Sequence, residues 1–163
     1  MSEILGALFK YLVALLGITA VVLVLYSVFS TNKTQTHISD VTQLATNTQS
    51  LYAAQSTFTT LTNAVAISSA LAPSDMIAGT ALTNPWGGTV TVAVNASNSQ
   101  QFTITTTLVP AAACVKMATG FSSVVGLQVG AAGSPVAVAL PADAGTVAGQ
   151  CAATNTVIMT FGH

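Results

Sequence analysis

Nineteen consecutive residues, Tyr11 to Phe29, contain no charge, no proline and no amide side chain. As a helix with a rise of 1.5 Å per residue, this segment would be about 28 Å long, close to the hydrocarbon thickness of a bilayer. From Ile4 to Phe29 the only charged residue is Lys10. The sequence therefore predicts a membrane-spanning helix, or a helix that occupies a comparably apolar environment.

The next segment, Ser30 to Phe58, is polar but contains neither glycine nor proline. Its apolar positions recur every three to four residues, which is typical of an amphipathic helix: Ile38, Val41, Leu44 or Ala45, Thr48, and Leu51 or Tyr52. We predict one helix over residues 1–54, with residues 1–29 apolar all round and residues 30–54 amphipathic. Gly17 and Thr19 mark the point where the apolar half would unwind most easily.

Residues 55–163 change to the pattern of one globular α+β domain with an antiparallel sheet. The turn signal Asn84-Pro85-Trp86-Gly87-Gly88 precedes a run of alternating β-branched residues. We expect a β-hairpin with strands at 89–95 and 101–108, further strands at 124–129, 135–140 and 155–161, the last of them central, and short helices at 61–71 and 111–119. Residues 73–83 and 141–150 are expected to be loops.

Composition excludes several functions. Only 4% of the residues are charged, with three Lys or Arg, four Asp or Glu and a net charge of −1, so no basic patch is available to bind nucleic acid. The two histidines, His37 and His163, have no Cys, Asp or Glu at ligand spacing. We therefore predict no metal site and expect His37 to be solvated or interfacial.

No nucleotide-binding or nucleophile motif is present, and the four acids are scattered along the chain. We expect a protein that is not an enzyme and needs no cofactor. The chain has two cysteines, Cys114 and Cys151. In a domain with few charges attached to a membrane segment, this pair predicts one structural disulfide formed in an oxidising compartment. Two buried free thiols are the alternative.

The order of these segments resembles the type IV pilins, specifically the type IVb class. An apolar N-terminal helix with an acid near its start continues into an amphipathic half and then a β-sheet domain with two cysteines. The motifs Asn84-Pro85-Trp86-Gly87-Gly88, Ala113-Cys114-Val115-Lys116-Met117 and Phe161-Gly162 are similar to those of the major pilins of conjugative thin pili and toxin-coregulated-type pili. The resemblance implies the type IV pilin fold, a long N-terminal α-helix packed on an antiparallel β-sheet.

The resemblance also implies a mechanism. Subunits wait in the inner membrane, anchored in lipid, and then assemble into an extracellular filament whose core is made of copies of the apolar helix. Prepilin peptidase would expose and methylate Met1, and the inner-membrane assembly machinery would add subunits. An acid near the N-terminus neutralises the terminal amine of a neighbouring copy, and Glu3 is the candidate here. This acid is usually the fifth residue, where this chain has Leu5.

We therefore expect a major pilin that polymerises with itself into a type IV pilus for conjugative contact or surface adhesion. A minor pilin or tip adhesin, which could also be a partner of the filament, is one alternative. The other is a bitopic membrane protein that carries a small periplasmic binding module.

Overall fold

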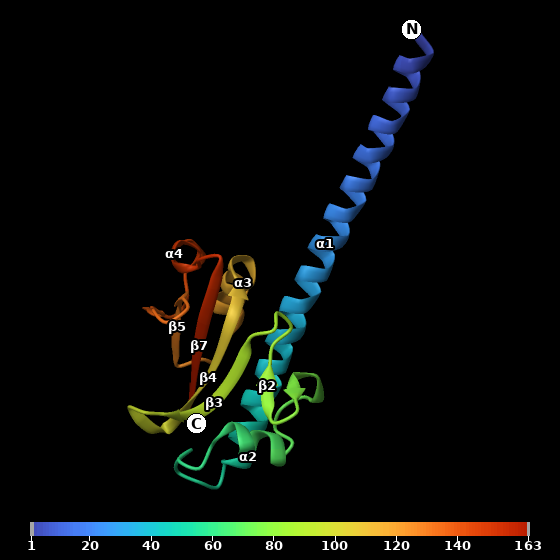
Figure 1. The fold of residues 1–163 in the computed structure, drawn as a ribbon. Coiled ribbons are helices and arrows are strands. Elements are labelled where there is room, and N and C mark those ends of the chain that lie inside the picture. The colour runs from blue at the N-terminus through green and yellow to red at the C-terminus, as the bar shows by residue number, and fades with distance from the viewer. Residues whose placement is uncertain (1, 163) are drawn as a thin grey trace. The chain divides into compact units, whose positions relative to one another are not determined.

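The computed structural model describes residues 2–162, without the side chains of residues 2–5, 7, 23, 26 and 27 (Figure 1). It divides into two compact units, Met1–Lys33 and Thr34–His163. Helix α1, Ser2–Leu51, forms the first unit and contributes its last turns, from Thr34 onward, to the second.

The first unit is a helix with an apolar surface. Gly17 and Thr19 lie within α1, and the Thr19 hydroxyl donates to the Leu16 carbonyl at 2.9 Å. Judged on the residues that the structure describes, no helix is long and apolar enough to cross a membrane. The structure thus gives no support to the membrane span predicted for Tyr11 to Phe29.

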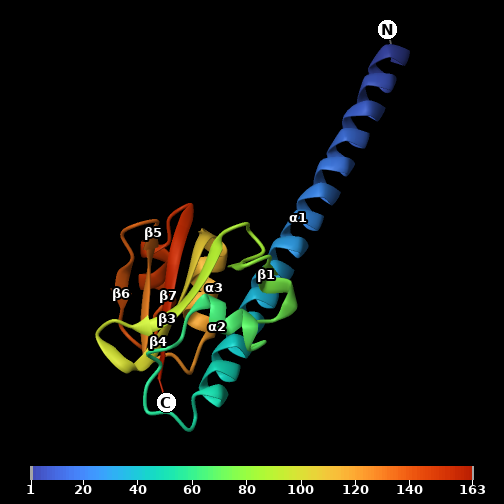
Figure 2. The ribbon, with the colours of Figure 1, turned by 60° about the horizontal axis from the view of Figure 1, so that its bottom comes forward.

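The second unit is built on one antiparallel sheet in the order β1-β2-β3-β4-β7-β5-β6 (Figures 1 and 2). The strands are β1 Ile77–Ala78, β2 Ala81–Thr83, β3 Thr89–Asn95, β4 Asn98–Pro110, β5 Gly126–Ala131, β6 Val136–Val138 and β7 Thr154–Gly162. The predicted hairpin is confirmed as β3 and β4, and the last strand is central, between β4 and β5. The α+β class with an antiparallel sheet is confirmed.

The core lies on one face of the two central strands. Alternate residues of β4 and β7 face it, and the register places Phe102 opposite Phe161 and Ile104 opposite Met159. Phe102 stacks on Phe161 with ring centroids 5.4 Å apart. The outward positions are largely threonine, a residue that suits a half-exposed strand. One face of each strand is therefore buried, and the other is half exposed over most of its length.

The C-terminal turns of α1 supply the helix that belongs to this core. Their buried residues repeat at intervals of three and four: Thr34, His37, Val41, Leu44 and Thr48, with Asp40 and Ala45 beside them. The Gln49 side-chain amide donates to the carbonyl of Gly162 at 2.5 Å. Tertiary packing of this stripe therefore holds a segment rich in Thr, which is a weak helix former.

Short helices complete the unit: α2 Asn63–Ser68, α3 Ala111–Gly120, α4 Ala144–Gln150 and the 3-10 helix η1 Ser74–Met76. Two loop predictions were wrong. Residues 73–83 contain η1 and the short β1–β2 pair, and residues 141–150 contain α4. Asp143 begins α4 by accepting a hydrogen bond from the Thr146 amide at 2.8 Å, a capping signal that the weak helix formers Gly, Thr and Val within α4 outweighed in the sequence.

The predicted disulfide is confirmed. Cys114 of α3 is bonded to Cys151, the residue that follows α4. The bond joins residues 37 positions apart, so it constrains the unfolded chain and would contribute roughly 3–4 kcal/mol on the chain-entropy model. The alternative of two free thiols is excluded.

The turn before β3 depends on a glycine. A Cβ at Gly88 would lie 2.0 Å from the Thr107 carbonyl oxygen and 2.8 Å from the Asn84 side-chain nitrogen. We predict that Gly88→Ala lowers the free energy of unfolding by roughly 2–3 kcal/mol, because backbone must move to make room. Chemical denaturation checks this.

Gly149 in α4 is the matched control, since a Cβ there meets nothing within 4 Å. Gly149→Ala should be neutral or stabilise by up to about 1 kcal/mol. Equal stability of the two alanine variants would contradict the assigned packing of the turn.

Candidate functional site: an apolar helix surface and a buried polar turn

The first candidate site is the exposed apolar surface of α1, which we call the apolar helix surface. Its members are large side chains that are each at least half exposed: Leu8, Phe9, Tyr11, Leu12, Val13, Leu15, Leu16, Ile18, Val21, Val22, Val24, Leu25, Val28 and Phe29. Successive residues of a helix point about 100° apart, so Tyr11, Leu12 and Val13 alone face three directions. The surface therefore surrounds the helix.

Exposed apolar areas of this extent are uncommon on soluble monomers and mark sites of association. Phe9 is 69% exposed and Tyr11 is 70% exposed, so both would lose considerable contact with water on burial. Fully burying one Val, Leu, Ile or Phe side chain contributes roughly 1.5–3 kcal/mol. A surface of many such residues is thus chemically suited to bind another apolar surface.

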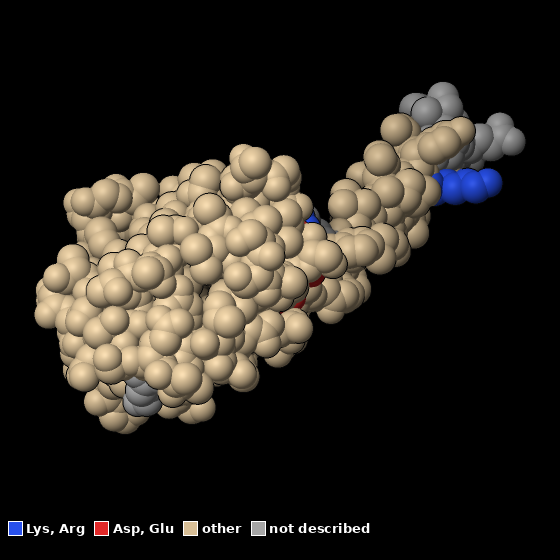
Figure 3. Space-filling model, turned by 90° about the horizontal axis from the view of Figure 1, so that it is seen from below, with Lys and Arg blue, Asp and Glu red and all other residues tan. Residues whose placement is uncertain are grey.

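Charged residues are scarce around this surface, and between Leu8 and Phe29 the sequence has one, Lys10. Lysine and acidic side chains occupy only small areas of the face shown in Figure 3. Between Thr34 and His163 the sequence has one lysine, Lys116, and three aspartates, Asp40, Asp75 and Asp143. The second unit therefore presents an almost uncharged surface to any neighbour.

The second candidate site lies in the second unit, where the Asn84–Gly88 turn meets α1. The Asn84 side-chain oxygen accepts hydrogen bonds from the amides of Trp86 and Gly88 at 3.0 and 2.9 Å. Because a backbone N–H can only donate, the side-chain atom that faces these two amides must be the oxygen. The side-chain nitrogen therefore points toward β4. That nitrogen donates to the Thr106 hydroxyl at 2.9 Å and to the Thr107 carbonyl at 2.6 Å.

His37 of α1 completes this buried polar turn. Its Nε2 lies 3.1 Å from the Thr106 hydroxyl, and its ring meets the edge of Trp86 with centroids 5.3 Å apart. The side chain is 0% exposed, and its Nδ1 has no hydrogen-bond partner among the described residues. The expectation of a solvated or interfacial His37 was wrong. Its spacing from Val41 and Leu44 placed it on the buried stripe.

Two titrations beside this turn are shifted in opposite directions. Burial lowers the pKa of His37 from 6.5 to about 4, an effect that the negative charge of Asp75 partly offsets. Burial raises the pKa of Asp40 from 3.8 to about 6, and the charge of Asp75 adds to this rise. At pH 5 both groups are therefore neutral in the folded protein.

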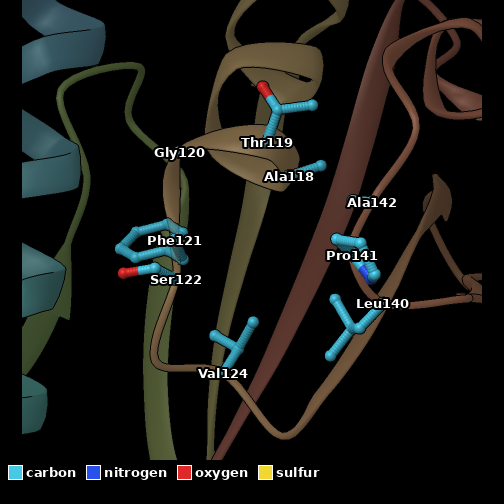
Figure 4. A pocket seen from close by; sticks show the side chains of 9 residues that line it. All are labelled: Ala118, Thr119, Gly120, Phe121, Ser122, Val124, Leu140, Pro141 and Ala142. Carbon is cyan, nitrogen blue, oxygen red and sulfur yellow. The ribbon is translucent and has the colours of Figure 1, made fainter.

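A separate cavity of about 490 Å³ lies between the end of α3 and the loops that follow α3 and β6 (Figure 4). Its lining is small or apolar, with two hydroxyls: Ala118, Thr119, Gly120, Phe121, Ser122, Val124, Leu140, Pro141 and Ala142. No side chain of this lining titrates near neutral pH. The cavity thus offers shape but no acid, base or metal ligand.

The sequence-predicted site residues are placed as follows. Cys114 and Cys151 are brought together. The predicted charge pairing of Met1 and Glu3 falls outside the described residues and side chains. Unwinding of the helix at Gly17 and Thr19 stays a prediction. Among the described residues, no group of three or more His, Cys, Asp or Glu could hold a metal ion.

These features describe a pilin-like protein: an α+β unit with one disulfide that continues an apolar helix. A family model described as PilS N terminal matches residues 31–162. The match covers most of the chain, so the chain belongs to this pilin-related family. It begins two residues after Phe29, so the apolar helix surface lies outside it. A search of curated proteins finds no match.

The opposed pKa shifts predict a compensated pH profile. Between pH 6.5 and 4, His37 binds a proton in the unfolded state but not in the folded state, so its contribution to stability falls as the pH falls. Asp40 is protonated in the folded state below about pH 6 but not in the unfolded state until about 3.8, so its contribution rises. We predict nearly constant stability of the native sequence over this range.

Asp40→Asn removes one half of this compensation. The variant should lose stability on acidification by up to about 1.4 kcal/mol per pH unit, the slope for one proton. Urea denaturation at several pH values measures it. A profile as flat as that of the native sequence would show that His37 does not titrate as assigned.

Proposed function

We propose that this chain is a structural subunit, a major pilin, that polymerises into an extracellular type IV filament. The proposal extends the resemblance of the sequence motifs to type IVb pilins, and two observations support it: the pilin-related family of residues 31–162 and the apolar helix surface. The apolar helix surface is the observation that carries the proposal, because an apolar surface of this extent must be buried away from water.

The cover that fits is the same surface of other copies. In a helical homopolymer every subunit presents identical apolar side chains, so beyond Lys10 each helix can be surrounded by its equivalents without a charged partner. Water then supplies the driving force, since each buried side chain is removed from it. The almost uncharged second unit allows neighbouring copies to approach without strong electrostatic repulsion.

Glu3 has a proposed role in this packing. A terminal amine buried among apolar helices would cost several kcal/mol unless it were paired. Glu3 of one copy would neutralise the terminal amine of a neighbour. The helix would be free to unwind at Gly17 and Thr19 if filament packing required it.

Family membership places the protein in a pilus-related context at the envelope or cell surface. The finer locations remain part of the proposal: inner-membrane lipid before assembly, and the extracellular pilus filament afterwards. The proposed partners are further copies of the chain, the inner-membrane assembly machinery and a minor pilin or tip adhesin. Conjugation and adhesion are the two roles that such a filament would serve, and no catalytic activity is proposed.

The proposal predicts that one lysine in the apolar helix surface prevents assembly. Val21 is 60% exposed in the single chain and would be buried in the filament. Val21→Lys would place an unpaired charge there, at a cost of several kcal/mol per subunit. Electron microscopy of sheared surface material, with an antibody to the chain, should show labelled filaments for the native sequence and none for the variant.

Ser97→Lys, in the exposed β3–β4 loop, is the matched control and should leave filaments intact. Glu3→Gln examines the charge pairing separately, and normal piliation would remove Glu3 from the proposal. Absence of this chain from every filament of the native cells would favour a membrane-anchored binding module. Label confined to filament tips would favour a minor pilin.

A further inference from the structure

In the second unit, His37 is a titratable side chain that lies between helix α1 and the sheet. His37 contacts both β4, at Thr106, and the turn, at Trp86. Asn84 bonds to the same Thr106 hydroxyl. The buried Thr106 hydroxyl of β4 is therefore shared by His37 of α1 and Asn84 of the turn, and the imidazole also contacts Trp86.

Only the neutral imidazole suits this position. In neutral His37 one ring nitrogen is an N–H donor and the other is an acceptor, and the Thr106 hydroxyl can partner Nε2 in either role. Protonation makes both nitrogens donors. Nδ1, which is buried without a partner among the described residues, would then carry an unsatisfied N–H on a positively charged ring.

The charged groups near His37 cannot compensate for this within the buried turn. Asp40, on the same helix, is 9% exposed and becomes neutral as the pH falls below about 6. Asp75 of η1 is exposed, and its charge only partly restores the basicity of His37. Lys33, one turn earlier on α1, is exposed and positive. Asn84, Trp86 and Thr106 do not titrate in this range.

We propose that His37 is an acid-operated latch: its protonation releases the Asn84–Gly88 turn from α1, while the neutral ring holds the two together. The released imidazolium gains solvent, the turn loses the ring contact at Trp86, and α1 loses the hydrogen bond from His37 to Thr106 of β4. The core pairs Phe102–Phe161 and Ile104–Met159 have no titratable side chain, so the central strands stay paired. The latch lies wholly in the second unit and does not depend on filament formation.

The chain provides its own reporter for this event. Trp86 is its only tryptophan, and its indole lies against the His37 ring, so its emission responds both to the charge on the ring and to its departure. The full-length chain in detergent micelles should show a reversible change in Trp86 emission centred near pH 4, the pKa of His37. Far-UV circular dichroism should keep its strand signal through this change.

Three variants assign the transition. His37→Gln, which can still donate to Thr106, should abolish it. Asp40→Asn should leave its midpoint near pH 4. Asp75→Asn should shift its midpoint to lower pH, because a charge that favours the imidazolium is removed. A transition that persists unchanged in His37→Gln would overturn the latch.

If His37→Gln fails to fold, an NMR titration of a second variant tests the latch. His163→Gln leaves His37 as the only histidine, so the imidazole NMR signals of that variant belong to His37 alone. Its titration should coincide with the change in Trp86 emission and with faster exchange of the Gly88 amide. Titration near pH 6.5, or titration near pH 4 without either change at the turn, would overturn the proposal.

Discussion

The apolar helix surface of α1 is the constraint on which the proposed function depends. Between Leu8 and Phe29 the large apolar side chains that the structure describes face every side of the helix and are at least half exposed, and no charged residue follows Lys10 within this range. Such a surface is stable in water only when it is covered. Identical copies provide a cover of the right chemistry around the whole helix, which a partner on one side would not.

The second unit achieves its specificity with amides and hydroxyls in place of charges. Asn84 holds the turn to Thr106 and Thr107. The Asn155 side-chain nitrogen donates to the Val109 carbonyl at 3.0 Å, and the Asn63 side-chain oxygen accepts a hydrogen bond from the Val92 amide at 2.6 Å. Neutral partners of this kind are not weakened by salt as exposed ion pairs are. An almost uncharged surface is therefore compatible with a uniquely packed core, and this leaves the surface free for contact between copies.

Sequence patterns predicted most of the sheet, because alternation of β-branched residues follows from having one buried face. The hairpin strand Thr89–Asn95 is an example. The last strand was predicted to be central for another reason, its apolar residues on both faces around Val157 to Met159. Helix α4 was missed because it contains two glycines and the β-branched Thr146 and Val147, which are weak helix formers, and its start is fixed by the Asp143 cap. Composition cannot weigh one such cap against several poor helix formers.

Of the site residues, the disulfide was predicted from the sequence and the burial of His37 was not. The cysteine pair could be inferred because two cysteines in such a chain leave few alternatives. The burial of His37 was missed because a histidine side chain occurs both on the surface and in the core. Its spacing from Val41 and Leu44 nevertheless placed it on the buried face of α1. Its partners, Thr106 and Trp86, come from distant parts of the chain, and no local pattern reports a contact across that separation.

Burial of the apolar helix surface by other copies can be measured directly with a single thiol. Both native cysteines are in the disulfide, so Val21→Cys and Ser97→Cys each add the only free thiol. In intact filaments a polar maleimide should label Cys at position 97 rapidly and Cys at position 21 only after detergent dissociates the subunits. Equal labelling of the two positions in intact filaments would show that other copies do not cover the helix.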